Sequence, residues 1–150
     1  MGIRLEIKGN TALDEELAAL SVRALRGAEL GTKEGAAILV DVIHSHMNGP
    51  MPPKPGGSDP AKRTGNLYNA VKTRAVAGGI GEGRWTYEVY MDQEAAVYAR
   101  RIEFGFRGVD SLGRHYNQPP YPYFFKGVDE AISSGVIDAF WFKVFEEALH

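Results

Sequence analysis

The candidate groups for chemistry in this sequence are histidines, carboxylates and serines. Cysteine is absent, which excludes a thiolate zinc site and a cysteine nucleophile. His44 and His46 are two positions apart, which on a helix separates them by about 200° around the axis. A zinc-binding pair on one helix needs a spacing of four residues. His115 and His150 are distant in sequence from both. We therefore expect no metal site.

Acidic side chains are numerous enough to suggest an acid–base pair of the kind that glycoside hydrolases use. The candidates are Asp92, Glu94, Glu103, Asp129 and Glu130. Nothing in their spacing places two of them across a cleft, and helix capping or solvated helix faces account for such positions. No Gly-x-Ser-x-Gly nucleophile elbow is present, and Ser133 and Ser134 lie in a helical pattern. We expect a protein that is not an enzyme.

The glycine-rich run at residues 78–83 has the composition of a phosphate-binding loop. Such a loop must be followed by a helix whose N-terminus binds the anion. Here apolar and polar residues alternate on both sides of the run, over residues 72–77 and 85–91. This alternation predicts a β-hairpin with a glycine turn, and no nucleotide or other cofactor is expected.

The composition bounds the architecture and the class of partner. A chain of 150 residues that is 44% hydrophobic fits one domain, over residues 1–150. Its net charge of -2 provides no general attraction for phosphate backbones. No apolar run has the length needed to span a bilayer, so no membrane partner is expected.

Hydrophobic periodicity predicts an α+β fold. Residues 2–8 alternate like a strand, and residues 11–47 carry an apolar stripe at helical spacing. Gly31 and Gly35 interrupt that long helix, so we expect a kink or a close backbone contact there. The N-terminal strand and the central hairpin are expected to form a small antiparallel sheet that packs on the long helix.

Three further helices are expected after the first one. A short helix begins at Thr64, whose hydroxyl can cap it, and Asp92 can cap a helix that ends at Gly105. A C-terminal helix follows and is expected to bend at Gly135. The segment before it is either a polyproline ligand or a rigid helix start, and the second interpretation places Pro122 at the first helical position.

Two long segments, residues 48–62 and 106–118, carry no clear apolar period and are expected to be loops. Loops of this length in a compact domain are usually functional or disordered. Glu103 stands just before the second one. Its carboxylate is expected to bond to backbone groups of the following loop, to pair with Arg100, Arg101 or Arg107, or to be solvated; we favour a structural tie.

Three ordered segments of the sequence resemble a known family. They are Arg63-Thr64-Gly65-Asn66-Leu67, then Ala96-Val97-Tyr98-Ala99 with Ile102-Glu103-Phe104-Gly105, and last Tyr121-Pro122-Tyr123-Phe124. Together they resemble the tail-component or head–tail joining proteins of long-tailed double-stranded DNA bacteriophages, over about residues 10–149. The matching positions are Thr64, Gly65, Leu67, Tyr98, Ala99, Glu103, Phe104, Gly105, Pro122 and Phe124. The departures are Ile102 before Glu103 and a longer segment from Phe106 to Gln118.

The resemblance implies a structural virion protein of the phage neck, assembled in the host bacterial cytoplasm. It would join the head connector to the tail tube as a ring, expected to be hexameric, around the DNA channel. The implied partners are other copies of the chain, the connector, adaptor or stopper proteins, and the tail terminator or tail tube proteins. DNA would pass through the ring without sequence-specific binding.

The two long loops are expected to be contact arms of that ring, because loops that order on contact let one small subunit reach several neighbours. The residues expected to make these contacts are Met51, Pro52, Pro53, Lys54, Pro55, Phe106, Arg107, Asp110, Arg114 and Tyr116. The alternatives are a tail terminator, a head-closure (stopper) protein, a host-directed binding module and, more distantly, a small phage hydrolase or nuclease.

Overall fold

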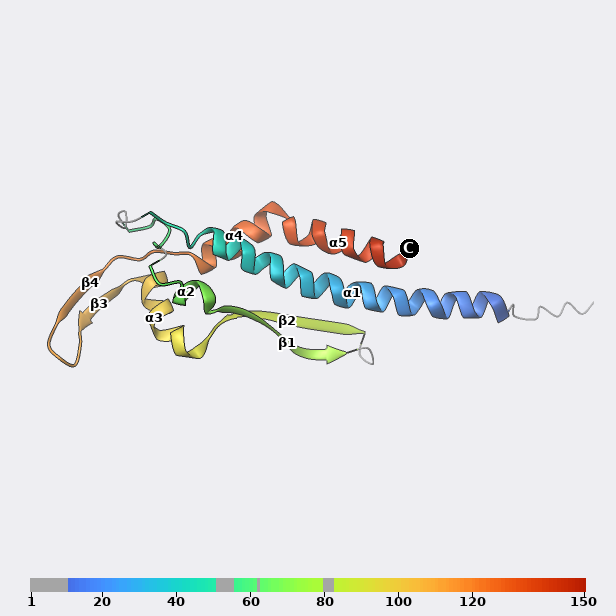
Figure 1. The fold of residues 1–150 in the computed structure, drawn as a ribbon, viewed down its shortest axis with the longest axis horizontal. Coiled ribbons are helices and arrows are strands. Elements are labelled where there is room, and N and C mark those ends of the chain that lie inside the picture. The colour runs from blue at the N-terminus through green and yellow to red at the C-terminus, as the bar shows by residue number, and fades with distance from the viewer. Residues whose placement is uncertain (1–10, 51–55, 62, 80–82) are drawn as a thin grey trace, which may run out of the picture.

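The computed structural model describes residues 11–50, 56–61, 63–79 and 83–150, and the fold is α+β, as predicted (Figure 1). The elements are α1 (Thr11–Ser45), α2 (Asn66–Asn69), β1 (Val71–Gly79), β2 (Arg84–Met91), α3 (Gln93–Phe104), β3 (Phe106–Val109), β4 (His115–Gln118), α4 (Phe124–Ser134) and α5 (Val136–Leu149). Helix α1 runs along most of the elongated molecule. Helices α4 and α5 lie along one side of it, and the β1–β2 hairpin lies along the other.

Glycines on α1 allow α5 to approach closely. A Cβ atom added at Gly31 would lie 2.8 Å from Cδ1 of Trp141, and one at Gly35 would lie 3.2 Å from Cγ2 of Ile137. The close contact predicted at these two glycines is therefore confirmed. Gly27, which the sequence analysis did not single out, would place a Cβ 2.9 Å from Cβ of Ala148. These three glycines of α1 form what we call the glycine seam.

The predicted β-hairpin is confirmed as β1 and β2, which pair antiparallel from Val71 opposite Met91 to Gly79 opposite Arg84. The register shifts between Ala75 and Ala77, which marks a β-bulge. Residues 80–82 of the glycine turn lie outside the described residues, as does the strand predicted at residues 2–8. Within the described residues the sheet on α1 therefore consists of these two strands.

The core lies near the C-terminal end of α1, where all the layers meet. Its buried cluster consists of Ile43, Met47, Val71 and Tyr123. Partly buried side chains such as Leu67 of α2 and Phe124 of α4 pack against this cluster. Ala70 and Val71, which follow α2, are also buried, so this short segment closes the core beside α1.

The predicted cap at Asp92 is confirmed, because its carboxylate accepts the N–H of Glu94 at the start of α3. The predicted helix start at Thr64 is wrong, because α2 begins at Asn66 after an N-cap at Gly65, and the Asn66 N–H lies 3.4 Å from the Thr64 hydroxyl in a long bond that does not cap the helix. Gly135 adopts φ 67° and ψ 14°, a left-handed conformation that ends α4 and begins α5. The single C-terminal helix with a bend is therefore two helices.

Two further predictions are wrong. Residues 106–118 form the β3–β4 hairpin instead of a loop, because the Asp110 carboxylate accepts the N–H groups of Leu112 and Arg114 and so builds a tight turn. Pro122 is not the first helical residue, since α4 begins at Phe124 after an N-cap at Tyr123. The chain before it is held extended by the Tyr121 N–H, which donates to the Ile102 carbonyl oxygen at 2.7 Å.

Candidate functional site

The centre of the candidate site is the carboxylate of Glu103, buried to 6% exposure near the end of α3. Oε2 accepts the N–H groups of Tyr123 at 2.9 Å and Phe124 at 3.0 Å, and Oε1 accepts that of Phe125 at 3.1 Å. These N–H groups belong to the start of α4, where helical donors have no partner within the helix. The backbone tie favoured for Glu103 is therefore present, but its partners lie at the start of α4 and not in the segment that directly follows Glu103.

The carboxylate suits this position electrostatically. A helix N-terminus carries a partial positive charge, so an anion that accepts several of its N–H groups is stabilised there. The same negative charge adds to the effect of burial on Tyr123, which raises the pKa of that phenol well above its ordinary value of 10.0. Because each carboxylate oxygen already accepts a backbone N–H, Glu103 acts here as a structural acceptor.

The three sequence segments that resemble the phage family meet at this end of the molecule. Tyr98 of α3 lines a hollow together with Thr64, Gly65 and Leu67 of the first segment. Glu103 then joins the second segment to the third through the backbone of Phe124. Segments that are separate in the sequence therefore form one connected unit in space.

The other matching positions take different places. Ala99 is buried in the interior, Phe124 packs against the core, and Pro122 lies just before the cap of α4. Gly105 has φ 76° and ψ 170°, and a Cβ there would lie 2.8 Å from the Gln118 carbonyl oxygen. Phe104 is on the surface, where its ring lies 5.9 Å from that of Phe125.

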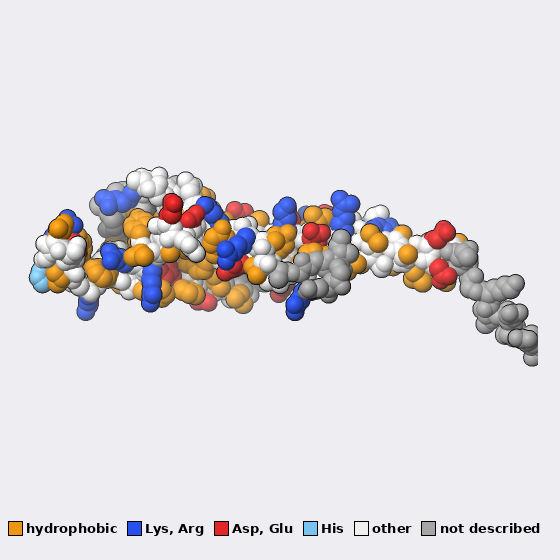
Figure 2. Space-filling view, turned by 90° about the horizontal axis from the view of Figure 1, so that it is seen from below, with side chains coloured by type: hydrophobic (Ala, Val, Ile, Leu, Met, Phe, Trp, Pro, Cys, Tyr) orange, Lys and Arg blue, Asp and Glu red, His pale blue; other side chains and the backbone are white. Residues whose placement is uncertain are grey.

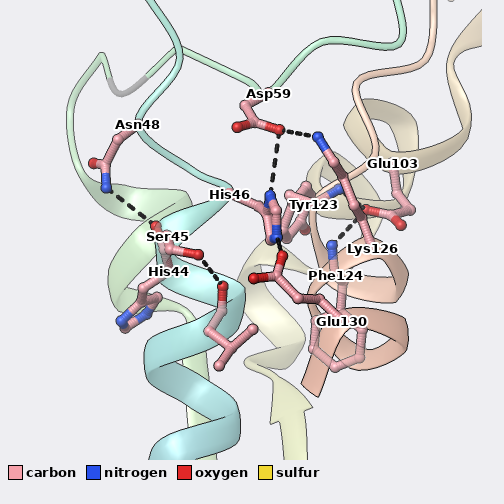
Figure 3. Close-up of polar contacts among 11 residues, drawn as sticks. His44, Ser45, His46, Asn48, Asp59, Glu103, Tyr123, Phe124, Lys126 and Glu130 are labelled. Carbon is pink, nitrogen blue, oxygen red and sulfur yellow. Dashed lines mark hydrogen bonds and ion pairs between the residues drawn. The ribbon is translucent and has the colours of Figure 1, made fainter. Parts of the chain in front are cut away.

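A second polar group, which we call the polar clamp, consists of His46, Asp59, Lys126 and Glu130 (Figure 3). His46 Nε2 lies 2.5 Å from Glu130 Oε2, and its Nδ1 lies 3.5 Å from Asp59 Oδ1. Lys126 donates to the same Asp59 oxygen at 2.5 Å. The clamp joins the described part of the 48–62 segment to α4 and to the turn after α1. No local sequence pattern indicates the clamp, because its members are far apart in the chain.

His44 does not share the partners of His46, because it contacts Tyr68. Its ring stacks on that of Tyr68 with 3.6 Å between centroids, and its Nε2 lies 2.9 Å from the Tyr68 carbonyl oxygen. Among the residues that the structure describes, no group of three or more His, Asp or Glu side chains could hold a metal ion.

The predicted contact residues of the second arm all lie in the β3–β4 hairpin. Asp110 accepts from Arg114 Nε at 2.6 Å and from the Tyr116 hydroxyl at 3.1 Å, in addition to the two turn N–H groups. These bonds, led by the N–H of Arg114, lower the pKa of Asp110, and the bond to Asp110 raises the pKa of Tyr116. Arg101 lies over the Phe106 ring at 4.3 Å, and Arg107 is exposed.

Part of the first predicted arm lies within the described residues. Met51, Pro52, Pro53, Lys54 and Pro55 lie outside the described residues. On either side of them, Gly49 forms a parallel bridge with Ala61, and the Gly57 N–H donates to the Pro120 carbonyl oxygen at 2.8 Å. The described part of this segment is therefore attached to the same end of the molecule as the β3–β4 hairpin.

Large apolar side chains are exposed at both ends of the long axis. At one end α1 presents Leu13, Leu17 and Leu20, which are 51%, 55% and 43% exposed; we call this the leucine face. At the other end lies what we call the hairpin end, whose exposed apolar residues are Phe104, Val109, Leu112, Tyr116 and Phe125. In the described part of the chain no helix has the length and apolar character needed to cross a membrane.

No protein-family model, curated protein or solved structure matches this chain.

Proposed function

We propose that this chain is a structural subunit of the neck of a long-tailed bacteriophage and joins the head connector to the tail tube as a ring. Its function is assembly around the DNA channel, and its partners are other copies of itself and the neighbouring neck proteins. Tail terminator and head-closure proteins are the alternatives within the same class of ring-forming neck components.

The observation that carries the proposal is the pair of exposed apolar surfaces at opposite ends of the molecule. Leu17 on the leucine face is 55% exposed, and Leu112 on the hairpin end is 76% exposed. Contiguous exposed apolar surface usually marks a place where another protein binds. A subunit that is built into a closed ring needs two such surfaces, one for each neighbour.

The connection between the three family-like segments gives a second line of support. Glu103 and the hollow beside Tyr98 hold the segments together at the end of the molecule that carries the β3–β4 hairpin. A rigid base of this kind would hold the hairpin in a fixed direction, as an arm that contacts a neighbouring subunit requires. The motif residues would then serve the geometry of assembly, as the resemblance implies.

The test is a mass-spectrometric count of this protein in purified particles of the phage that encodes it, relative to a virion protein of known copy number. A closed neck ring with simple rotational symmetry predicts about six or twelve copies per particle. Cells infected by a phage from which the gene is deleted should accumulate separate heads and tails. Complete absence of the protein from finished particles would overturn the proposal.

A further inference from the structure

The leucine face is a continuation of the surface on which α5 packs. Leu13, Leu17 and Leu20 recur at spacings of four and three residues, which keeps them within about 60° of one another around the helix. The same helical count places the glycine seam, with Gly31 at its centre, on that same side of α1. One side of α1 is therefore covered by α5 over the glycines, while no described element covers it over the leucines.

The end of α5 marks the boundary between the covered and uncovered parts. Arg23 Nη1 of α1 donates to the carbonyl oxygen of Leu149, the last residue of α5, at 3.2 Å. The preceding residues of α1 extend beyond α5 and beyond the β1–β2 hairpin (Figure 1). This free part of the helix is about 18 Å long at the normal rise per residue.

Among the described residues, the charges at the two ends of the molecule are opposite. The free part of α1 carries Asp14, Glu15 and Glu16 and no lysine or arginine. The hairpin end carries the exposed arginines 100 and 107, while Arg114 is paired with Asp110 and Glu103 is bonded to the backbone of α4. Figure 2 shows this separation, with acidic side chains at the α1 end and basic side chains among apolar ones at the opposite end.

The hairpin end also offers a hollow that apolar side chains can enter. Its volume is about 510 Å³, and its lining includes Phe104, Phe106, Arg107, Pro119 and Pro120. A cleft of this size is within the range that proteins use for binding, and aromatic rings and prolines suit leucine side chains. Arg107 at the same hollow is placed to meet a carboxylate that flanks those leucines.

We propose that the leucine face of one copy of this chain docks into the hollow at the hairpin end of the next copy. Leucines 13, 17 and 20 supply the apolar contact, and Asp14 and Glu16, which flank them on the helix, meet Arg107 and Arg100. The contact joins two different surfaces, so it repeats head to tail and can close into a ring. This inference deepens the proposed neck assembly and rests on it.

The first test exchanges charges across the contact. Asp14→Lys with Glu16→Lys makes both ends basic, and Arg100→Glu with Arg107→Glu makes both ends acidic. Each double variant alone should self-associate at least about tenfold more weakly than the unaltered chain, because like charges then face each other. An equimolar mixture of the two should regain association, since each basic end meets an acidic one. Sedimentation velocity and native mass spectrometry measure both effects.

Two matched controls accompany the charge exchange. Lys33→Glu with Lys143→Glu changes the charge equally on exposed positions away from both ends and should leave association unchanged. Leu17→Ser should weaken association, whereas Val22→Ser should not, because Val22 is 64% exposed on the opposite side of the same helix segment. Circular dichroism verifies that every variant is folded.

Three results would overturn this contact. They are an unaltered chain that stays monomeric up to its solubility limit, a mixture that does not regain association, and equal effects of the Leu17 and Val22 substitutions. If Leu17→Ser weakened association while Arg100→Glu with Arg107→Glu had no effect, the contact would instead join two leucine faces. None of these results depends on the particle count, and absence of the protein from particles would overturn the neck function while leaving the contact intact.

Discussion

Oε2 of Glu103 accepts the N–H of Phe124 at 3.0 Å, and this bond joins the end of α3 to the first turn of α4. The same carboxylate accepts the N–H groups of Tyr123 and Phe125. Glu103→Ala would leave these buried donors without an acceptor. We expect it to lower the free energy of unfolding by about 2 kcal/mol or more, measured by urea denaturation.

Glu103→Gln distinguishes the hydrogen-bond acceptors of this side chain from its negative charge. Glu103→Gln keeps one acceptor oxygen but places an NH₂ group against a backbone donor, so its loss of stability should be intermediate. Glu147→Ala, an exposed glutamate on α5, serves as the control and should change stability little. If Glu103→Ala were no more destabilising than Glu147→Ala, the proposed cap would not hold α4.

Gly31→Ala tests the glycine seam. Alanine normally favours a helix over glycine by about 1 kcal/mol, so a gain in stability would be expected if the position were free. A Cβ here would lie 2.8 Å from Trp141, so we expect a net loss of about 1–3 kcal/mol and a changed Trp fluorescence spectrum. Gly35→Ala, with a 3.2 Å contact to Ile137, should be milder, and the reverse order would contradict the seam.

The turn of the β3–β4 hairpin should respond to acid. Hydrogen bonds, first from the Arg114 N–H, lower the pKa of Asp110 below its ordinary value of 3.8. A carboxyl group with a lowered pKa in the folded state stabilises the fold above pH 3.8 and loses that contribution as the pH falls through the lower, folded value. Amide hydrogen exchange in residues 106–118 should therefore accelerate below about pH 4 relative to α1.

Asp110→Asn should remove this response, because the side chain can no longer change its charge. Ser111→Ala in the same turn should retain it. Equal acid responses in the unaltered chain and in Asp110→Asn would show that another group controls the hairpin.

The phenol of Tyr123 should make the fold sensitive to alkali. Burial, with a contribution from the Glu103 carboxylate, raises the pKa of Tyr123 above 10.0. Stability that depends on this neutral phenol is complete below pH 10.0 and declines as the pH rises toward the folded value, because the unfolded chain ionises first. Urea midpoints at pH 9 and pH 11 should therefore differ less in Tyr123→Phe than in the unaltered chain.

The phenylalanine variant should cost little stability at neutral pH, since among the described residues the Tyr123 hydroxyl bonds to the sulphur of Met91 alone, at a long 3.9 Å. Tyr87→Phe, at a half-buried tyrosine of β2 that faces α1 and α5, controls for a general effect of removing a hydroxyl. An alkaline loss that persists unchanged in Tyr123→Phe would assign it to other groups.

Local patterns in the sequence were sufficient to predict the long helix, the glycine-linked hairpin and the cap at Asp92. Each of these features depends on residues close together in the chain, where the helical or strand period and the turn chemistry act directly. The β3–β4 hairpin was missed because its strands have only four residues each and include Gly108 and Asn117, which interrupt the apolar alternation.

The site depends on distant residues, and this limits what the sequence can predict. The sequence indicates Glu103 as a candidate, but the N–H groups that its carboxylate accepts belong to the start of α4, some twenty positions later in the chain. The polar clamp joins His46 to Glu130 across 84 positions, and no local pattern connects them. A glutamate followed by a proline–aromatic helix start is the signal that could have suggested the cap.

The glycine seam also orders the events of synthesis. The Trp141 indole donates to the Thr32 hydroxyl at 3.3 Å, across 109 positions of sequence, so α1 emerges from the ribosome long before α5 exists to cover it. Until then the glycines and leucines on that side of α1 are equally open to chaperones and to other nascent chains. Docking of α5 covers the glycines and leaves the leucines exposed, so that side of α1 takes its final apolar surface after α5 has folded against it.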